Sequence, residues 1–421
     1  LNTELKIIGK KEDSNYISIN YFRDSVLEEL KTITEVPAST IETGGLKIYT
    51  TLDATAQKSL EDSVYSYIND DTKIETAAIM MDPNTGEVLA LIGGNNYSKS
   101  QFNRATKAKR QVGSTMKPLL YYSALESGFT SSSSFTSEKT TFTFSGGKSY
   151  SPKNYNDRYA EGPLSMEAAI AYSDNIYAVK THLFLGENNL INTAKRLGIT
   201  SNLSEVPSLA LGTSEISLIE MTSAYSCFAS LGYKTTPHFI KKIEDSKGNI
   251  LYENKEEKEL LLNPSLTYIL NEMLTSTYNK NFINYNYPTL ISLLPQITHK
   301  YAIKSGTTDT DLLIMGYNKN VVLGVWNGYD NNTKIDSSEY SHHKNIWIDT
   351  MESYFKQKEA SWYEIPNNVV GVLTEPITGA LATDETQNKE MFFYLKGTEP
   401  SAESNYKDLE AVFQEENNSN T

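Results

Sequence analysis

The sequence predicts a mixed α/β (α+β) fold in which an antiparallel sheet is flanked by helices. Residues 77–94 contain two apolar runs joined by the turn-rich segment DPNTGE, and residues 301–328 contain three more strand-like runs in quick succession. Between them, residues 164–232 have a helical texture. Because strand pairs stand before and after the helices, we expect an antiparallel sheet that draws on both ends of the chain, and not an alternating parallel one.

The elements before the first hairpin carry clear local signals. Residues 46–52, LKIYTTL, alternate in polarity, which predicts a strand with Leu46 and Ile48 on one face. Asp53 then stands at the N-cap position of a helix that runs through ATAQKSLEDSVYSYI. The chain before this strand, residues 1–45, is expected to be a small N-terminal linker region.

The later elements are predicted from composition and from the residues that form turns and helix caps. Residues 128–163 are rich in Ser, Thr, Gly and Tyr without a sustained period, which predicts long loops with short strands. A second hairpin is expected over 239–252, around SKGN. Asn263 caps a helix from Pro264 to about Tyr278, with proline at its preferred first helical position. The polar, acidic tail over 401–421 is expected to lack fixed structure.

Charge and composition exclude several classes of function. The 421 residues carry a formal net charge of −14 and no basic run, so no nucleic-acid-binding surface is expected. The single cysteine, Cys227, lies among small and apolar residues, which predicts a buried, inert thiol. No apolar run reaches the length of a bilayer span, and the sequence begins at Leu1 without a signal-peptide pattern. We therefore expect a portion of a longer protein, which leaves membrane attachment through another segment open.

Five SxxK patterns occur, but only the one in GSTMKPLL stands at a glycine-to-helix transition after a hairpin. There Ser114 opens a helix, and Lys117 lies three residues on along the same face. A hydroxyl becomes a nucleophile when a base takes its proton, and lysine serves if burial and a second cation lower its pKa. The alternative is that Ser114 is an ordinary helix cap. The other four patterns begin at Ser145, Ser341, Ser353 and Ser404.

A second motif, AYSDNIYAV, follows the first by 59 residues and contributes Ser173 and Asn175. Taken alone it reads as a helix cap or a turn, and Ser18 with Asn20 shows how easily SxN arises. The motif is informative because it lies between the first motif and a third one in the sequence.

The third motif, YAIKSGTTD, places Lys304, Ser305, Gly306 and Thr307 on a predicted strand. Lys304 supplies the second positive charge that would help to keep the first lysine neutral, and the two hydroxyls suit a carboxylate. Gly306 leaves room for a substrate backbone along the strand edge. The Thr307 N–H is expected to complete an oxyanion hole with that of Ser114.

In this order the three motifs resemble SxxK, SxN and KTG, the signature of penicillin-binding proteins and class A β-lactamases. The wider text resembles the transpeptidase domain of a class A, bifunctional penicillin-binding protein. The similar segments are GLKIYTTLD, AAIMMDPNTGEVLALIGG, SLALGTSEISLIEMTSAY and LKGTEP, so the resemblance covers roughly residues 44–400. It implies a penicillin-binding/serine β-lactamase-like fold over residues 46–400.

The resemblance also implies roles. Ser114 would be the acylated nucleophile, Lys117 its base, Ser173 the proton relay to the leaving amine, and Asn175 a holder of the substrate amide. The remaining catalytic and substrate-binding groups would be Lys304, Ser305, Gly306, Thr307 and Thr308. The substrate would be a peptidoglycan stem peptide ending in D-Ala-D-Ala, with β-lactams as mimics that stay attached to the serine. No metal or cofactor is implied.

Three features depart from the family pattern or lie outside it. Ser305 replaces the commoner threonine, and DTDLLIMGY lacks the aromatic residue usual before the glycine. No glycosyltransferase domain is present, so the resemblance implies one half of the bifunctional enzyme. A missing N-terminal part would carry that domain and attach the protein to the outer face of the bacterial cytoplasmic membrane.

Rival interpretations remain at this stage. A β-lactamase would use a glutamate in ExxLN, which ELLLN at Glu259–Asn263 matches, but a strand end followed by a helix cap explains that segment better. A penicillin-sensing receptor domain would bind β-lactams without processing wall peptides. A triad hydrolase is disfavoured because no GxSxG surrounds a serine. A metal pair at His342 and His343 is disfavoured because no carboxylate or cysteine stands at ligand spacing.

Overall fold

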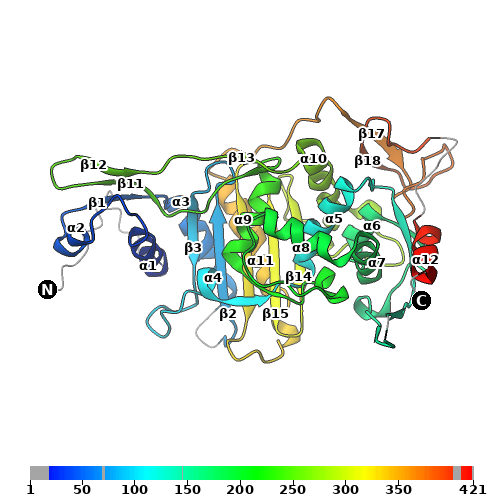
Figure 1. Ribbon diagram of the computed structural model, residues 1–421, viewed down its shortest axis with the longest axis horizontal. Helices are drawn as coiled ribbons and strands as arrows, with labels where there is room; N and C mark the ends of the chain where they lie inside the picture. The colour runs from blue at the N-terminus through cyan, green and yellow to red at the C-terminus, as the bar shows by residue number, and fades with distance from the viewer. Residues whose placement is uncertain (1–18, 69–71, 145, 402–408, 420–421) are drawn as a thin grey trace.

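The computed structural model describes residues 19–68, 72–144, 146–401 and 409–419. Its centre is a five-stranded antiparallel sheet with the strand order β14-β15-β16-β2-β3 (Figure 1). The predicted hairpin and the three later strands are confirmed, as is a sheet that draws on both ends of the chain. The strands are β2 (Glu75–Met81), β3 (Val88–Ile92), β14 (Ala302–Thr307), β15 (Asp311–Tyr317) and β16 (Val322–Gly328).

Helices cover both faces of this sheet. On one face lie α3 (Ala54–Tyr67) and α11 (His342–Phe355), and on the other lies α9 (Leu218–Ala229). Two glycines in the strands allow helices α11 and α9 to approach the sheet closely. A Cβ on Gly316 would lie 2.4 Å from the Trp347 ring of α11, and a Cβ on Gly324 would lie 2.7 Å from Thr222 Oγ1 of α9. Because both faces are covered, β15 and β16 are buried along their whole length.

A second group of helices forms the part of the domain beyond α9, to the right in Figure 1. Side-chain caps start α3 and several of these helices. The predicted caps are confirmed: Asp53 accepts hydrogen bonds from two N–H groups at the start of α3, and Asn263 does the same for α10. These helices are α5 (Lys117–Glu126), α6 (Met166–Tyr172), α7 (Asn175–Leu185), α8 (Glu187–Arg196) and α10 (Pro264–Met273).

An arm of three strands extends from the sheet at the N-terminal end of the molecule (Figure 1). Its strands are β1 (Lys47–Thr50), β11 (Ile240–Glu244) and β12 (Ile250–Glu253), which confirms the strand at 46–52 and the hairpin at 239–252. The other sheets are two-stranded pairs: β4 (Lys109–Gln111) with β9 (Glu215–Ser217), β5 (Ser134–Ser137) with β8 (Gly162–Ser165), β6 (Phe142–Thr143) with β7 (Ser149–Tyr150), β10 (Tyr233–Lys234) with β13 (Glu259–Leu260), and β17 (Val369–Thr374) with β18 (Glu390–Leu395).

The N-terminal region contains helices α1 (Ile19–Leu30) and α2 (Ala38–Thr43). Helix α1 packs on β3 through buried side chains that include Tyr21 and Phe22, and the Tyr21 hydroxyl donates to the Ser100 carbonyl over 2.6 Å. Residues 1–18 of the expected linker lie outside the described residues. The boundary at residue 45 stays a prediction.

The acidic tail departs from its expected lack of structure. Residues Glu410–Ser419 form helix α12, with Leu409 and Phe413 buried. The Phe413 ring lies 5.7 Å from that of Phe135, and Glu410 forms a 2.8 Å ion pair with Lys180, whose side chain is 3% exposed. Tertiary packing and a charge partner therefore order a segment whose composition is polar. Residues 402–408 and 420–421 lie outside the described part of the tail.

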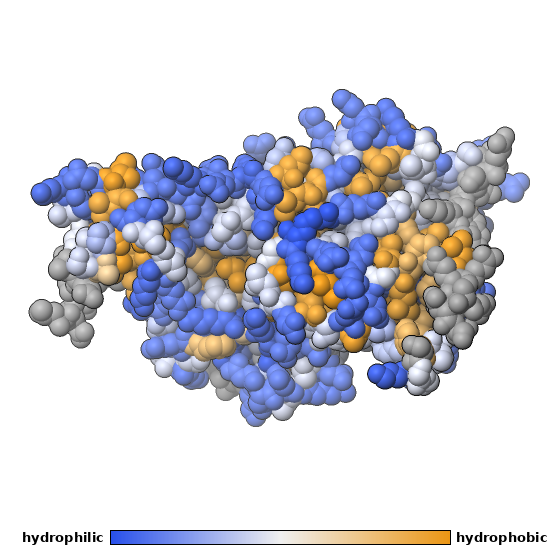
Figure 2. Space-filling view, in the orientation of Figure 1, coloured by the Kyte–Doolittle hydropathy of each residue, from blue (hydrophilic) through white to orange (hydrophobic). Residues whose placement is uncertain are grey.

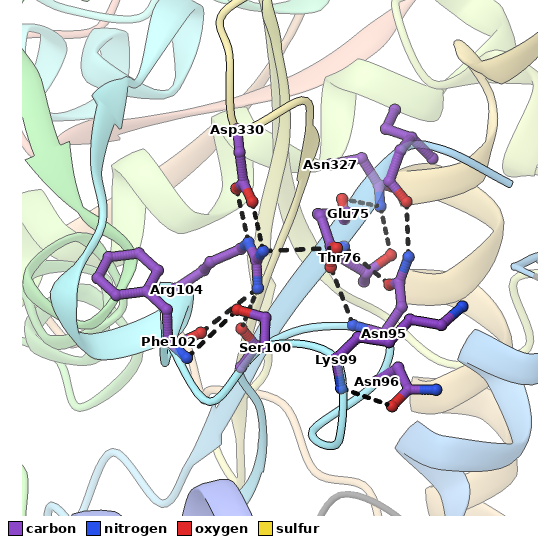
Figure 3. A network of polar contacts seen from close by, with 12 residues as sticks. Glu75, Thr76, Asn95, Asn96, Lys99, Ser100, Phe102, Arg104, Asn327 and Asp330 are labelled. Carbon is purple, nitrogen blue, oxygen red and sulfur yellow. Dashed lines mark hydrogen bonds and ion pairs between the residues drawn. The ribbon is translucent and has the colours of Figure 1, made fainter.

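A polar network centred on Arg104 fixes the segment that leads to the first motif (Figure 3). The Arg104 side chain is 2% exposed, and its guanidinium pairs with Asp330 through contacts of 2.8 and 2.5 Å. It also lies 3.4 Å from Glu75 at the start of β2. Bidentate geometry makes such a pair orientation-specific. The network therefore joins the loop after β16, the sheet and the short helix α4 (Arg104–Lys107).

The surface agrees with the charged composition. Figure 2 shows a face that is mostly hydrophilic, on which apolar residues gather in separate patches. None of the helices in the described ranges combines the length and the apolarity that a bilayer span requires.

The predicted burial of the Cys227 thiol is confirmed, and burial raises the pKa of this thiol to about 12.

Candidate active site

Ser114 lies in one turn of 3-10 helix, η1 (Gly113–Met116), and the α-helix α5 begins only at Lys117. The sequence predicts a regular helix from Ser114, and Pro118 is the reason for the difference. Proline has no N–H to donate to the Ser114 carbonyl, so the Lys117 N–H donates there instead and tightens the turn. The Ser114 side chain is half-buried at the start of this turn.

Three glycines bring η1 against its neighbours. Gly113 has a φ of +55°, and Gly212, in the loop before β9, has a φ of +72°. A Cβ on Gly212 would lie 2.0 Å from the Gly113 carbonyl oxygen, and a Cβ on Gly306 would lie 2.5 Å from the Val112 carbonyl oxygen. Gly306 was expected to make room for a substrate. Its missing side chain also makes room for the serine segment, so strand β14 packs directly on η1.

Ser173 occupies a strained position between two helices. It ends α6 with φ +54° and ψ +44°, the left-handed region that a residue with a Cβ rarely adopts. Asp174 follows as the N-cap of α7, and its side chain accepts the Tyr177 N–H. This tight connection directs the side chains of Ser173 and Asn175 toward Lys117.

Strand β14 carries the third motif at an edge of the five-stranded sheet. Lys304 is fully buried, Ser305 is 7% exposed, and Thr307 is exposed. Thr308 was predicted to bind substrate. Its hydroxyl oxygen accepts hydrogen bonds from the N–H groups of Thr310 and Asp311, so it stabilises the turn into β15.

The three motifs meet at the Ser173 hydroxyl. The Lys117 Nζ lies 3.3 Å from Ser173 Oγ, and the Lys304 Nζ lies 2.9 Å from the same atom. The Lys117 ammonium also donates to Asn175 Oδ1 over 2.7 Å and to the Ser173 carbonyl over 2.7 Å. Within the described ranges, the Ser114 hydroxyl has no protein hydrogen-bond partner. Two ammonium groups therefore flank one hydroxyl beside the turn that carries Ser114.

Burial lowers the pKa of both lysines. The pKa of Lys117 falls to about 7 because desolvation disfavours its charged form, although the Asp174 carboxylate opposes the fall. The pKa of Lys304 falls well below its ordinary value because of desolvation, followed by repulsion from Lys117 and Lys344. A lysine with a pKa of about 7 is half neutral at pH 7 and is then able to accept a proton.

The arrangement supports acyl transfer chemistry. It combines a hydroxyl at a helix start, a lysine three residues on whose pKa burial lowers to about 7, and a second hydroxyl hydrogen-bonded to both lysines. Backbone N–H groups of η1 and of edge strand β14 lie close together, since a Cβ on Gly113 would lie 3.1 Å from the Thr307 N. Such N–H pairs stabilise an oxyanion.

Sequence reasoning missed several residues that hold this site. Asp174 was read only as part of a motif, yet its buried carboxylate accepts hydrogen bonds from Ser137 and Asn154. Gly212 lies in LGTSE, directly before a strand, and that position was a signal for close backbone packing. Lys344 lies on α11 at a place that no local pattern connects to the other lysines.

The rival interpretations have structural outcomes. Glu259 is exposed at the start of β13, and Asn263 caps α10, so the interpretation of ELLLN as a strand end followed by a cap is confirmed. Within the described ranges, no group of three His, Cys, Asp or Glu side chains is placed to hold a metal ion. A cavity of about 290 Å³ beside the arm is lined by charged groups that include Glu87 and Lys241, and none of its lining residues belongs to the lysine cluster.

Comparison with known families identifies the domain. The family described as penicillin binding protein transpeptidase domain matches residues 76–337, a range that holds all three motifs. The chain belongs to the penicillin-binding protein transpeptidase family. The resemblance predicted from the motifs is thereby confirmed.

Relatives and solved structures agree with this assignment. The transpeptidase domain is 42% identical over 383 residues to penicillin-binding protein 2D of Bacillus subtilis (strain 168), covering 90% of this chain and 55% of that protein. It is 36% identical over 336 residues to penicillin-binding protein 1A of Aquifex aeolicus (strain VF5), covering 78% and 44%. The chain thus spans about half the length of these curated relatives.

The fold is that of solved penicillin-binding proteins. The crystal structure of penicillin-binding protein 1A from Haemophilus influenzae superposes with a TM-score of 0.78 at 20% identity, covering 94% of this chain and 78% of that one. The PonA1 protein from Mycobacterium tuberculosis in complex with penicillin V superposes with a TM-score of 0.69 at 22% identity, covering 82% and 96%. The predicted antiparallel sheet with flanking helices is confirmed.

Proposed function

We propose that the domain is a serine D,D-transpeptidase that cross-links peptidoglycan stem peptides ending in D-Ala-D-Ala. The observation that carries the proposal is the approach of two buried lysine ammonium groups to the Ser173 hydroxyl, at 3.3 and 2.9 Å, beside the turn that holds Ser114. Each of the three motifs contributes to that arrangement.

In the acylation step, the Ser114 Oγ attacks the carbonyl carbon of the D-Ala-D-Ala peptide bond, and neutral Lys117 accepts the hydroxyl proton. Backbone N–H groups of Ser114 and Thr307 stabilise the oxyanion. The C–N bond then breaks. Ser173 delivers a proton to the leaving amine and recovers one from the ammonium of Lys117, which is 3.3 Å away. Free D-alanine departs and an ester on Ser114 remains.

Lys304 has a different part. With the hydroxyls of Ser305 and Thr307 it binds the terminal carboxylate of the donor peptide, while its 2.9 Å hydrogen bond orients the Ser173 hydroxyl. Asn175, whose Oδ1 lies 2.7 Å from Lys117 Nζ, orients that base and holds the substrate amide. In the second step, an amine of a neighbouring stem attacks the ester carbon and loses a proton to Lys117. The new amide C–N bond forms, the ester C–O bond breaks, and the Ser114 oxygen takes the proton back from Lys117.

A β-lactam reacts at the same serine in this proposal. Its strained amide replaces the scissile peptide bond, and its carboxylate takes the place of the terminal carboxylate, so the acyl-enzyme persists. The PonA1 protein, which has the same fold, has been solved in complex with penicillin V, and this supports this part of the proposal.

The place of action follows from the substrate. Peptidoglycan lies outside the cytoplasm, so the domain acts on the outer face of the bacterial cytoplasmic membrane, attached through another part of the protein. The share of its relatives that the chain spans, 55% and 44%, leaves room for a glycosyltransferase domain and an anchor in the whole protein.

The test uses a D-Ala-D-Ala pentapeptide as donor and a second stem peptide as amine acceptor. We expect release of D-alanine together with a cross-linked product, and neither with Ser114→Ala. Hydrolysis of penicillin with rapid turnover would indicate a β-lactamase instead. Stable acylation by penicillin without any D-alanine release from peptide or thioester donors would indicate a penicillin-sensing domain.

A further inference from the structure

Asn154, in the long loop between β7 and β8, makes an unusual number of contacts to the second motif. It is 8% exposed. Its Oδ1 accepts the Asn175 N–H over 2.7 Å and the Ile176 N–H over 3.4 Å. Its Nδ2 donates to Asp174 Oδ2 over 2.6 Å. Both ends of one amide therefore hold the turn that carries Ser173 and Asn175.

These contacts complete a helix N-terminus from outside the helix. The first N–H groups of a helix lack partners within it, and an N-cap side chain satisfies one or two of them. Among the first N–H groups of α7, the side chain of the N-cap residue Asp174 accepts only that of Tyr177. Asn154 accepts the two N–H groups that precede it. The start of α7, and with it Asn175, is therefore tied to a loop 21 residues earlier in the chain.

The neighbouring residue fixes the side chain of Asn175. The Asn175 Nδ2 donates to the Lys153 carbonyl over 2.7 Å, and the Asn175 Oδ1 accepts from Lys117 Nζ over 2.7 Å. Because the amide nitrogen is engaged by a carbonyl, the amide oxygen must face the lysine. The pair 153–154 thus controls both the backbone and the side-chain orientation of Asn175.

The loop that carries Asn154 is strained. Asn156, Asp157 and Glu161 have φ values of +56°, +51° and +55°, the left-handed region that residues with a Cβ rarely adopt. Strained backbone persists only where surrounding contacts fix it, and it is concentrated near functional sites. The described anchors of this loop to the second motif are Asn154 and Lys153, which makes Asn154 more than a generic loop residue.

A second buried group supports the same turn. The Ser137 hydroxyl, at the end of β5, donates to Asp174 Oδ2 over 2.5 Å and lies 3.3 Å from Asn154 Nδ2. Unlike Asn154, it has no contact with Asn175. Substitution of Asn154 should therefore disturb this turn more strongly than substitution of Ser137.

We propose that Asn154 is a positioning residue of the acylation reaction, which holds the Asn175 amide against Lys117 so that the base and the Ser173 relay keep their geometry. The proposal rests on the proposed function of the domain. Asn154 touches neither the substrate nor the reacting atoms, so its whole effect on the rate should pass through Asn175.

The test is a double-mutant cycle on the rate of covalent labelling by a fluorescent penicillin, with Asn154→Ala, Asn175→Ala and the double variant. Misplacement of a catalytic group by about 1 Å costs roughly a hundredfold in rate, so we expect Asn154→Ala to label about tenfold to a hundredfold more slowly. In the Asn175→Ala background the same change should cost less than about threefold, because the group that it positions is gone.

Thermal unfolding of each variant separates positioning from stability. A merely structural role predicts that the two single effects on the labelling rate multiply in the double variant, which would overturn the proposal. The same cycle is repeated with Ser137→Ala in place of Asn154→Ala. A several-fold loss of labelling rate in Ser137→Ala that disappears in the Asn175→Ala background supports the proposal. Asn249→Ala, an exposed change on the arm, should label at the wild-type rate.

Failure of the proposal differs from failure of the proposed function. A wild-type domain that takes up no label at Ser114 contradicts the proposed function, and this inference falls with it. A wild-type domain that is labelled, together with Asn154→Ala labelled at an equal rate, contradicts this inference alone.

Discussion

The rate at which Ser114 is acylated should depend on pH through the protonation of Lys117. Burial lowers the pKa of this lysine from 10.5 to about 7. Only the neutral amine accepts the serine proton, so the rate constant for acylation should rise as the pH rises through 7 and level off above it.

The size of the effect follows from the pKa. A base with a pKa of about 7 is about half neutral at pH 7 and about 1% neutral at pH 5, so the rate should fall roughly tenfold for each pH unit below 6. An ordinary lysine would be less than about 0.1% neutral at pH 7. Burial therefore increases the fraction of Lys117 that is neutral at pH 7 roughly a thousandfold.

The assay measures the first-order acylation constant at saturating penicillin between pH 5 and 9. Saturation matters because the pKa of Lys304 is lowered as well, and loss of its charge at high pH weakens carboxylate binding but not the saturated rate. Lys117→Arg is the control. A guanidinium stays charged throughout this range, so this variant should lose at least about a hundredfold and its remaining rate should not depend on pH.

Two results would refute this reasoning. One is a saturated rate that is independent of pH between 5 and 9. The other is a rise whose midpoint lies near 10, which is the value of a solvent-exposed lysine. Either would mean that Lys117 is not a base whose pKa burial has lowered.

Three further changes have expected outcomes; the first two are measured by thermal or denaturant unfolding, and the third by the rate of penicillin labelling together with thermal unfolding. Lys117→Met should stabilise the domain by about 1–4 kcal/mol at pH 6 and by less at pH 9, because the cost of burying the ammonium falls as pH rises from 7 toward 10.5. Arg104→Met should cost roughly 2–3 kcal/mol, since it leaves two carboxylates without their buried partner, whereas Lys58→Met at an exposed pair should cost under about 0.5 kcal/mol. Gly212→Ala places a Cβ 2.0 Å from a carbonyl oxygen of the serine turn and should slow penicillin labelling at least about tenfold, whereas Gly128→Ala, with φ +89° and open space around it, should change stability alone.

Local signals accounted for much of the fold. The Asp53 and Asn263 caps, the hairpins and the three late strands depend on residues within a few positions of one another, and each is where the sequence predicts it. The order of the three motifs also led to the prediction that Lys304 supplies a second positive charge near Lys117, and both lysines lie on the Ser173 hydroxyl, at 3.3 and 2.9 Å, which the sequence did not single out as their meeting point.

The remaining features arise from contacts between distant segments. Asn154 lies in a loop with no periodicity, and its role becomes visible only beside α7. The tail looked unstructured because its composition is polar, yet Phe413 and Glu410 dock on a buried aromatic ring and a buried lysine. The packing of the serine turn on Gly306 of β14 likewise joins segments far apart in the sequence, and no local pattern reveals it.

The most direct test of the central claim is to map the covalent adduct after incubation with penicillin. The account predicts one added β-lactam mass per chain, carried by the peptide that contains Ser114, in the wild-type domain. Ser114→Ala should carry none. An adduct on any other residue, or an intact protein mass after saturating exposure, would contradict the account.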